Sequence, residues 1–519
     1  MNETPKKIIR NTVTNALGFI YIFASNIVLV PFILHSLGAE IYGSVWVVIG
    51  ALTAYIGLLD LGTGTAFVKY IAEYHTKHLH GDVLEIVNTG IVMYAVLSIA
   101  IAGVVLLFDT TLLSLVGVTH AALNDAQFVL RISVTIFVLV GVTSPITAII
   151  SALQRMDIFF RSTMIVQTWT IVGTVIVLNH GEGVRGLILI NLSASLINVV
   201  MLTYYAKREM AFLKLSPRYV RWEKCKIFLL YGTNIQISRF SQIILFQTDR
   251  VLSLKFFGPL TATYYDISAR LTNAVRSITG VLLTALVPAI SAIDAQQNIR
   301  QLSALYFRGT KYLILAASCF FVFVGVFAEN IIAVWLGDGF ATAALFVRVL
   351  SIGYFFNIIT GVASSMTAGL GRTDMDRNYG ILVSIINIVL VLSGAAIFGA
   401  VGIAAGTTVS FIIGSVYFFI IFHRSISEKN KTIFTLLVKP ITVALFCAIT
   451  LHWISDVIVF NMSRIERGVV LVIAGACYTG AYLAIIVRMS LLDEYDKDII
   501  KKIINKIICT VRGFRNAPY

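Results

Sequence analysis

Long apolar segments separated by short polar ones run through the whole chain. A membrane-spanning helix needs about 20 apolar residues, and on that criterion the sequence predicts fourteen spans. Twelve are expected at 12–34, 41–64, 86–108, 127–152, 158–178, 184–206, 226–252, 261–291, 310–332, 342–367, 376–398 and 400–422. Two more are expected at 433–454 and 467–487. The pattern predicts an all-α polytopic membrane protein.

Lys and Arg are distributed unequally between the predicted loops. The loops at 35–40, 109–126 and 329–341 contain neither residue, whereas the segment 207–226 holds seven of them. Because basic loops stay in the cytoplasm, both termini are expected inside. Arg464 and Arg467 run against this trend.

The two halves of the chain resemble each other at an offset near 217–220 residues. The matches are Thr14-Asn15 with Thr233-Asn234, Gly38 with Gly258, SALQRMD from Ser151 with AGLGRTD from Ala368, Gly186 with Gly402, and Arg208 with Arg424. Six spans per repeat give both halves the same orientation, related by an axis along the membrane normal, with a substrate site expected between them. The predicted parts are therefore a six-helix bundle at 1–206, a cytoplasmic linker at 207–225, a second six-helix bundle at 226–424, two additional helices at 425–490 and a tail at 491–519.

Composition agrees with a membrane protein and leaves little room for other classes. Of 519 residues, 58% are hydrophobic and 13% are charged, against about 25% charged in soluble domains. The net charge of +14 lies mostly between spans, so nucleic acid is not an expected partner. Neither the five cysteines nor the HTKHLH loop from His75 predicts a metal site, and no cofactor is expected. The tail at 493–515 has the apolar and Lys-rich faces of a helix at the membrane surface.

The segment 239–276 carries six charges within two apolar spans. They are Arg239, Asp249, Arg250, Asp266, Arg270 and Arg276. A charge at the bilayer centre costs at least about 2.5–3.5 kcal/mol unless it faces protein or water. The sequence therefore predicts a transport cavity with a charged lining here.

The six charges differ in what they predict individually. Asp266 and Arg270 are four residues apart and are expected to pair on one helix face. Asp249 and Arg250 lie near the predicted outer end of their span and are expected to reach the membrane surface. Arg239 and Arg276 have no acidic residue within one turn, so we expect them to line the cavity.

Fewer charges stand in the other spans. Arg131 and Arg348 are further cavity candidates, and Arg131 and Asp60 are the comparable charges of the first half. Asp60, Asp249 and Asp266 are the candidates for carrying a coupling proton or sodium ion. Lys69, at the inner end of span two, is expected to reach the inner surface.

An excess of arginine favours an anionic substrate. Guanidinium binds phosphate through two parallel hydrogen bonds and stays charged, so a diphosphate on a lipid would fit. Outward movement of that anion from a negative cytoplasm is favourable by about 2.3 kcal/mol per charge per 100 mV.

Several segments resemble bacterial polysaccharide transporters. These are NTVTNALGFIYIFASNIVLVPFILHSLGAEIYGSVWV, LLDLGTGTAFVKYIA, QTDRVLSLKFFGPLTATYYDIS, AGLGRTD and GAVGIAAGT. Such proteins are oligosaccharide-lipid flippases of the multidrug/oligosaccharidyl-lipid/polysaccharide exporter superfamily. The resemblance covers about 10–425.

The resemblance implies two six-helix bundles in a V with a cationic central cavity. It implies export of undecaprenyl-diphosphate-linked sugar units across the inner membrane for O-antigen, capsule or exopolysaccharide assembly, with an ion gradient as driving force. It assigns diphosphate binding to Arg239, Arg270 and Arg276, and less directly to Arg131 and Arg348. Polysaccharide polymerase and chain-length proteins are the partners it suggests.

Two other classes compete with this interpretation. A multidrug or small-solute transporter of the same superfamily would need an acidic cavity for drug cations, whereas the deep charges here are mainly basic. A membrane-embedded transferase, polymerase or ligase would need a large outer loop with catalytic residues, and the longest predicted one is 109–126. The chain is therefore not expected to be an enzyme.

Overall fold

The structure, a computed structural model of the 519-residue chain, describes residues 21, 24, 25, 27–57, 64–283, 286–426, 431–459, 462–489, 491 and 496. Within these ranges every regular element is a helix, and eleven helices are long and apolar enough to cross a membrane. The all-α polytopic fold is confirmed. The count of fourteen stays a prediction, because the charge-bearing helices α10 and α11 fall outside those eleven and the first span is described only in part.

The N-terminal group of helices follows a helix that covers Ile27–Leu37. Its members are α2 (Ala39–Ile41), η1 (Tyr42–Val47), α3 (Val48–Gly57), α4 (Gly64–Thr76), α5 (His80–Leu107), α6 (Asp109–Leu115), η3 (His120–Ala122), α7 (Leu123–Ala152), α8 (Met156–Asn179) and α9 (Gly183–Glu209). The elements α2, η1 and α3 are consecutive, and η1 is a π-helical turn. Such turns occur often at functional sites.

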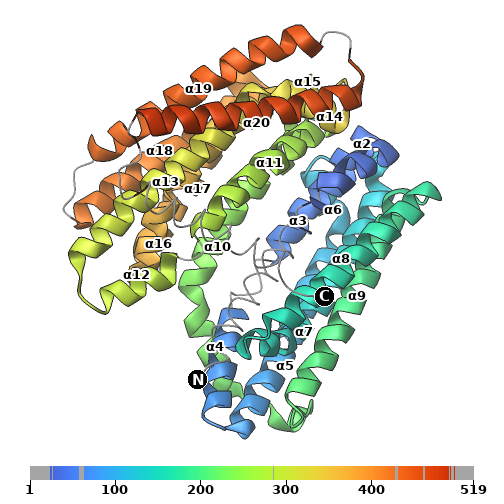
Figure 1. The fold of residues 1–519 in the computed structure, drawn as a ribbon. Coiled ribbons are helices and arrows are strands. Elements are labelled where there is room, and N and C mark those ends of the chain that lie inside the picture. The colour runs from blue at the N-terminus through green and yellow to red at the C-terminus, as the bar shows by residue number, and fades with distance from the viewer. Residues whose placement is uncertain are drawn as a thin grey trace, which may run out of the picture.

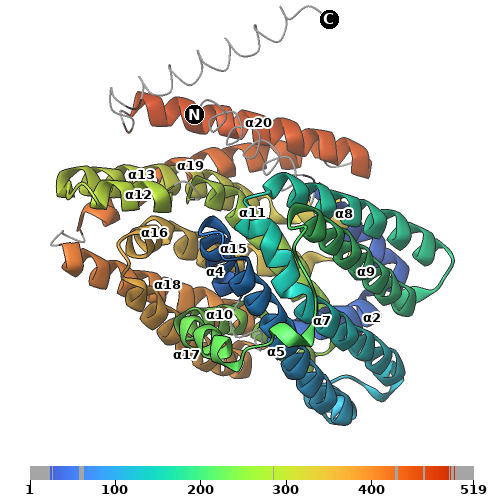
Figure 2. The ribbon, with the colours of Figure 1, turned by 90° about the horizontal axis from the view of Figure 1, so that it is seen from below.

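The C-terminal group begins after a short connection that contains η4 (Pro217–Tyr219). Its members are α10 (Trp222–Phe257), α11 (Pro259–Gly280), η5 (Val281–Leu283), α12 (Leu286–Asp294), α13 (Ile299–Val326), α14 (Ala328–Leu336), α15 (Ala341–Ile359), α16 (Gly361–Gly369), α17 (Thr373–Phe398) and α18 (Ala400–Ile426). Figure 1 shows the two groups side by side, with α10 and α11 between them. The helices α19 (Lys431–Val459) and α20 (Arg464–Arg488) pack against α13 and α14 at the edge of this group (Figure 2).

Backbone conformation confirms the internal repeat. Five positions with positive φ in the first half have a counterpart with positive φ 217–220 residues later. They are Gly38 and Gly258, His78 and Gln297, Gly117 and Gly337, Gln154 and Gly371, and Gly181 and Gly399. In two of the five pairs the residue types differ, but the backbone has a positive φ at both positions. The two halves therefore share a backbone plan.

Three predicted loops are wrong in their extent. The loop between spans two and three was expected to cover about 20 residues, but α4 and α5 leave only Lys77–Leu79 between them. Likewise, α12 and α13 occupy most of the segment 292–309 between the predicted spans 261–291 and 310–332, and α6 lies in the predicted loop 109–126. Helices with polar surfaces at the membrane boundary lack the apolar run by which the spans were identified. Among the described residues no cluster of His, Cys, Asp or Glu could hold a metal ion.

The long helix α10 contacts both groups. Near its start, Lys224 Nζ lies 2.6 Å from Asp82 Oδ1 on α5, and Arg221 Nε lies 3.3 Å from Glu85 Oε1. Its later turns pack on α11, α17 and α18. The predicted linker at 207–225 is thus attached to the N-terminal group. The predicted amphipathic tail lies outside the described residues except for Leu491 and Asp496, and Lys311 Nζ donates to Asp496 Oδ2 at 2.5 Å.

The turn between α10 and α11 generates a prediction about stability. Gly258 has φ 85° and ψ −180°, a region open essentially to glycine alone, so Gly258→Ala should lower the free energy of unfolding by about 1–3 kcal/mol. Gln154 has φ 54°, so Gln154→Gly should change stability by less than about 1 kcal/mol, because relieved strain offsets a more flexible unfolded chain. Thermal unfolding of the purified variants tests this. Equal losses in both variants would contradict the assignment of strain to Gly258.

Candidate functional site

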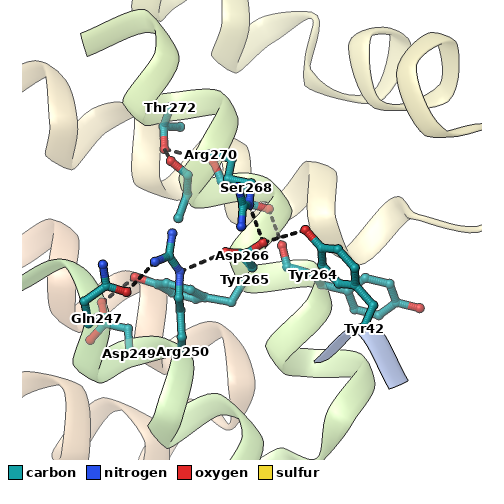
Figure 3. Close-up of polar contacts among 11 residues, drawn as sticks. Tyr42, Gln247, Asp249, Arg250, Tyr264, Tyr265, Asp266, Ser268, Arg270 and Thr272 are labelled. Carbon is teal, nitrogen blue, oxygen red and sulfur yellow. Dashed lines mark hydrogen bonds and ion pairs between the residues drawn. The ribbon is translucent and has the colours of Figure 1, made fainter. Parts of the chain in front are cut away.

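A buried carboxylate between two guanidiniums forms the centre of the charged constellation. The helices α10 and α11 run antiparallel from the Gly258 turn, so residues at equal distance from the turn face each other. Asp266 on α11 is 1% exposed. Arg270 Nε donates to its Oδ2 at 2.6 Å, and Arg250 Nε lies 2.9 Å from its Oδ1 (Figure 3). The predicted Asp266–Arg270 pair is confirmed.

The N-terminal group contributes a third partner to this carboxylate. Tyr42, the first residue of η1, donates from Oη to Asp266 Oδ2 at 2.9 Å (Figure 3). Close by, Thr263 Oγ1 donates to the Ala39 carbonyl at 2.6 Å. The two groups of helices therefore contact each other directly at the site, at the end of the molecule that holds Gly38 and Gly258.

Arg250 and Arg270 line a cavity of about 600 Å³. On the same wall, α11 adds Asn273 and Ser277. The rest of the lining is mostly apolar. Outside α10 and α11 it comes from three places in the chain: Ile27 and Val30, Ile331, Val334 and Trp335 of α14, and Leu471 of α20. Two guanidiniums share one buried carboxylate, so this wall has a surplus of positive charge.

Arg276 lies about 1.7 helical turns beyond Arg270 and has different partners. Its Nε donates to Asn357 Oδ1 at 3.0 Å and its Nη1 to Asn273 Oδ1 at 3.3 Å. Its guanidinium carbon is 4.9 Å from the centre of the Phe246 ring, a cation–π distance. Within the described part of the chain no carboxylate pairs with Arg276. Through Asn273 it connects to the cavity that Arg270 lines.

Arg239 lies on α10, and its side chain is half-buried. It precedes Arg250 by eleven residues, which corresponds to about 16 Å along the helix and a rotation of about 20°. The two arginines therefore share one face of α10. Because α11 runs in the opposite direction, Arg239 lies at the depth of Arg276.

The other sequence-predicted residues lie elsewhere. Arg131 Nη2 pairs with Asp109 Oδ2 at 2.8 Å, and more than half of the arginine side chain is exposed. Arg348 Nη2 pairs with Glu329 Oε1 at 3.0 Å and borders a separate apolar groove between α13, α15 and α19. Asp60 lies outside the described residues. Neither Arg131 nor Arg348 lines the cavity at Arg270.

The expectation that Asp249 and Arg250 reach the membrane surface is wrong. Asp249 is 1% exposed, and the Arg250 side chain is 14% exposed. The sequence predicts that this span ends at 252, but α10 continues to Phe257. The element η1 packs against α10 and α11 here, and α2 packs against α11. Both charges are thus too deep to reach water along their own helix.

Asp249 belongs to a second polar cluster. Tyr265 Oη and Thr407 Oγ1 both donate to Asp249 Oδ2, the latter at 2.6 Å. Asn387 Nδ2 donates to Thr407 Oγ1 at 3.2 Å and to Ser410 Oγ at 3.3 Å. The Oδ1 atoms of Asp249 and of Asn387 are buried without a hydrogen-bond partner among the described atoms. Two unsatisfied buried oxygens in one cluster suit a cation or a proton.

Sequence reasoning missed Tyr42, Asn387 and Thr407. All three are uncharged residues within apolar spans, where polar side chains often satisfy themselves on their own helix. Their importance comes from contacts across 224 residues for Tyr42 and 158 residues for Thr407. No local pattern marks such contacts.

The chain is similar to known membrane transporters and flippases. Residues 8–294 match the sequence profile of the family described as polysaccharide biosynthesis protein. A Shigella flexneri protein named for O-antigen transport is 20% identical over 391 residues, 70% of this chain and 86% of that protein. The lipid II flippase MurJ, in an inward closed conformation, has a TM-score of 0.68 at 13% identity over 93% of this chain and 99% of its own. An inward-facing multidrug resistance transporter of the MATE family has a TM-score of 0.67 at 16% identity, over 80% and 94%. The chain therefore shares its fold with both of these solved structures.

The contact at η1 generates a prediction about conformation. A Cβ on Gly43 would lie 2.1 Å from the Pro259 carbonyl oxygen and 2.5 Å from Thr263 Oγ1, so Gly43→Ala should force the two groups of helices apart at this end. Electron–electron distances between spin labels at the exposed positions Thr119 and Asp338 should then shift to longer values. Gly50→Ala, where nothing lies within 4 Å of the new Cβ, is the control. Identical distance distributions in both variants would show that Gly43 does not hold this contact.

Proposed function

The chain belongs to the polysaccharide biosynthesis protein family, and on that premise we propose that it is an alternating-access flippase for lipid-linked oligosaccharides. Its substrate is an undecaprenyl-diphosphate-linked sugar unit, which it carries across the inner membrane for assembly of a cell-surface polysaccharide such as O-antigen, capsule or exopolysaccharide. The observation that carries the proposal is the surplus of guanidinium on the wall of the cavity between the two groups of helices.

The arginines suit the diphosphate in three ways. Arg250 and Arg270 approach the cavity from different helices, so they can bind two phosphoryl groups at once. Arg276 is held by amide oxygens and a ring, and it gains its first full charge partner when an anion arrives. Arg239, at the same depth on α10, is the further diphosphate ligand in this proposal.

The rest of the cavity suits the lipid part of the substrate. Opposite the arginines, Ile27, Val30 and the α14 side chains present an apolar wall. A polyprenyl chain moves from the bilayer to such a wall at little cost in free energy, because both surroundings are apolar. The diphosphate is charged and needs the guanidiniums as partners. The two halves of the cavity thus match the two halves of an amphiphilic substrate.

Cavity charge also separates this proposal from the main alternative. A multidrug or small-solute transporter of the same superfamily shares the fold, as the likeness to the MATE transporter shows. Drug cations would need carboxylates toward the cavity, but Asp266 is 1% exposed behind its two arginines. The proposal therefore favours an anion.

The cluster at Asp249 is the proposed site of the coupling ion. Asp249 is 1% exposed, forms no salt bridge among the described residues, and has an Oδ1 without a hydrogen-bond partner. A buried carboxylate in that state is costly, and a proton or a sodium ion removes the cost. Asp60 and Asp266 were candidates for the same role. Asp266 already has two guanidinium partners, so Asp249 is the preferred one.

Placement in the cell follows from the same proposal. Both termini lie in the cytoplasm, as the distribution of Lys and Arg predicts. The end of the molecule at Gly38 and Gly258 then faces outward. A polysaccharide polymerase and a chain-length protein are the proposed partners on that side.

The proposal predicts that the cavity arginines are required for export. Arg270→Ala, Arg276→Ala and Arg239→Ala should each reduce surface polysaccharide at least tenfold at normal protein level, and Arg276→Lys should be intermediate because lysine keeps the charge but not the paired hydrogen bonds. Smaller losses are expected for Arg131→Ala and Arg348→Ala, because these residues pair with carboxylates outside the cavity.

The measurement is complementation of a deletion strain, with surface polysaccharide and membrane protein quantified together. Arg185→Ala is the control, because Arg185 pairs with Asp125 at an exposed position. Full surface polysaccharide in Arg239→Ala, in Arg276→Ala and in the double variant would refute the cavity assignment.

The coupling site generates its own prediction. If sodium binds at Asp249, excess sodium should stabilise the wild type by about 2.7 kcal/mol at 100 times its dissociation constant, and Asp249→Asn and Asn387→Ala should abolish that effect. Asp376→Asn is the matched control, since Ser364 Oγ and Thr367 Oγ1 hold that carboxylate at 2.7 and 2.5 Å in another part of the fold.

Thermal unfolding in sodium chloride and in potassium chloride of equal concentration gives the answer. Without a sodium effect, a proton is the coupling ion, and export by the wild type should depend on the proton gradient. Normal export by Asp249→Asn under both gradients would remove Asp249 from the mechanism.

A further inference from the structure

The two cavity arginines are already occupied by an anion of the protein itself. Asp266 uses both carboxylate oxygens for them, Oδ2 with Arg270 at 2.6 Å and Oδ1 with Arg250 at 2.9 Å. Being 1% exposed, the carboxylate cannot turn to water. Asp266 takes the Nε edge of both guanidiniums, so a ligand that binds either arginine through this edge competes with Asp266.

This competition matters because the surrounding membrane is rich in the wrong anions. Phosphatidylglycerol and similar phospholipids carry one negative charge at the headgroup, and they reach any cavity that opens to the bilayer. A wall of unpaired arginines would bind them. A flippase with such a wall would be filled by bulk lipid rather than by its rare substrate.

A monoanion cannot profit from displacing Asp266. It brings one negative charge in place of one, and it leaves a buried carboxylate with less compensation than before, which is costly. A diphosphate brings at least two charges and two phosphoryl groups for guanidiniums that stand on α10 and on α11. Its extra charge can offset the loss of the ion pairs.

Tyr42 keeps a hydrogen bond to Asp266 while a ligand takes the place of the carboxylate at the arginines. Its hydroxyl donates to Oδ2 at 2.9 Å from the other group of helices, and it does not depend on either arginine. When the guanidiniums turn to a ligand, this hydrogen bond remains as a partner of the carboxylate. Displacement therefore needs less energy with Tyr42 than without it.

We propose that Asp266 is a specificity-determining residue, an internal counter-anion that a diphosphate displaces from Arg250 and Arg270 and a monoanionic phospholipid does not. The inference rests on the proposed function, because it takes the diphosphate lipid as substrate. It adds the reason why the cavity selects that lipid from a bilayer of anionic lipids.

Binding to the purified full-length protein tests the inference with two probes. Geranylgeranyl diphosphate represents the diphosphate lipid, and dioleoylphosphatidylglycerol represents the monoanion. In Asp266→Asn, which keeps the shape of the side chain, affinity for the phosphatidylglycerol should rise about tenfold, as expected when a charge-assisted competitor is removed. The wild-type preference for the diphosphate should shrink accordingly.

Tyr42→Phe should give the opposite signature. Its Asp266 still competes with the monoanion, so affinity for the phosphatidylglycerol should stay unchanged. Affinity for the diphosphate should fall several-fold, because displacement now leaves the carboxylate without its hydroxyl partner. This second variant keeps the test decisive if Asp266→Asn fails to fold. Asp125→Asn, whose carboxylate pairs with Arg185 at an exposed position, is the control.

The outcomes separate the inference from the proposed function. No binding of the diphosphate by the wild type would refute the proposed function itself. Binding by the wild type with unchanged discrimination in Asp266→Asn would overturn the counter-anion. Unchanged diphosphate affinity in Tyr42→Phe would count against it as well.

Discussion

The structure depends on how one buried carboxylate is neutralised. Removing one partner from a buried ion pair typically costs about 3–5 kcal/mol, because the remaining charge is left uncompensated. Asp266 holds Arg250 and Arg270 in place, and both arginines in turn give the cavity its charge. Because Tyr42 binds the same carboxylate, this interaction also joins the two groups of helices. The charge of the cavity and the contact between the two groups of helices therefore depend on the same carboxylate.

The internal repeat supplies the scaffold but not the charge. At the repeat offset of Gly38 and Gly258, Asp266 and Arg270 correspond to Trp46 and Gly50 in the first half. The first half thus has a similar backbone with an apolar and small-residue lining, and it contributes to the site through the hydroxyl of Tyr42. In the proposed function, the second half binds the charged part of the ligand and the first half provides a neutral surface.

Much of the fold could be predicted from the sequence, because spans and repeats are local or periodic signals. The Asp266–Arg270 pair was predictable for the same reason, since four residues on one helix fix the geometry. The position of Asp249 and Arg250 was not, because it depends on elements more than 200 residues away that cover the end of α10. The cluster of Asp249 with Thr407 likewise depends on packing between α10 and α18. Helical periodicity carries no information about such contacts.

A transport site must bind its substrate and also release it. Arg276, held by two amide oxygens and the Phe246 ring, has no carboxylate to give up, so an anion there gains the full interaction. At Arg250 and Arg270, under the proposed counter-anion role, the same anion competes with Asp266, and its net gain is smaller. Arg276 lies deeper and the other two lie near the Gly258 end, so the proposed counter-anion role implies weaker binding of an anion toward that end. Weaker binding at the Gly258 end favours release of the ligand over trapping. Asp266 weakens binding there without removing the charge of the arginines.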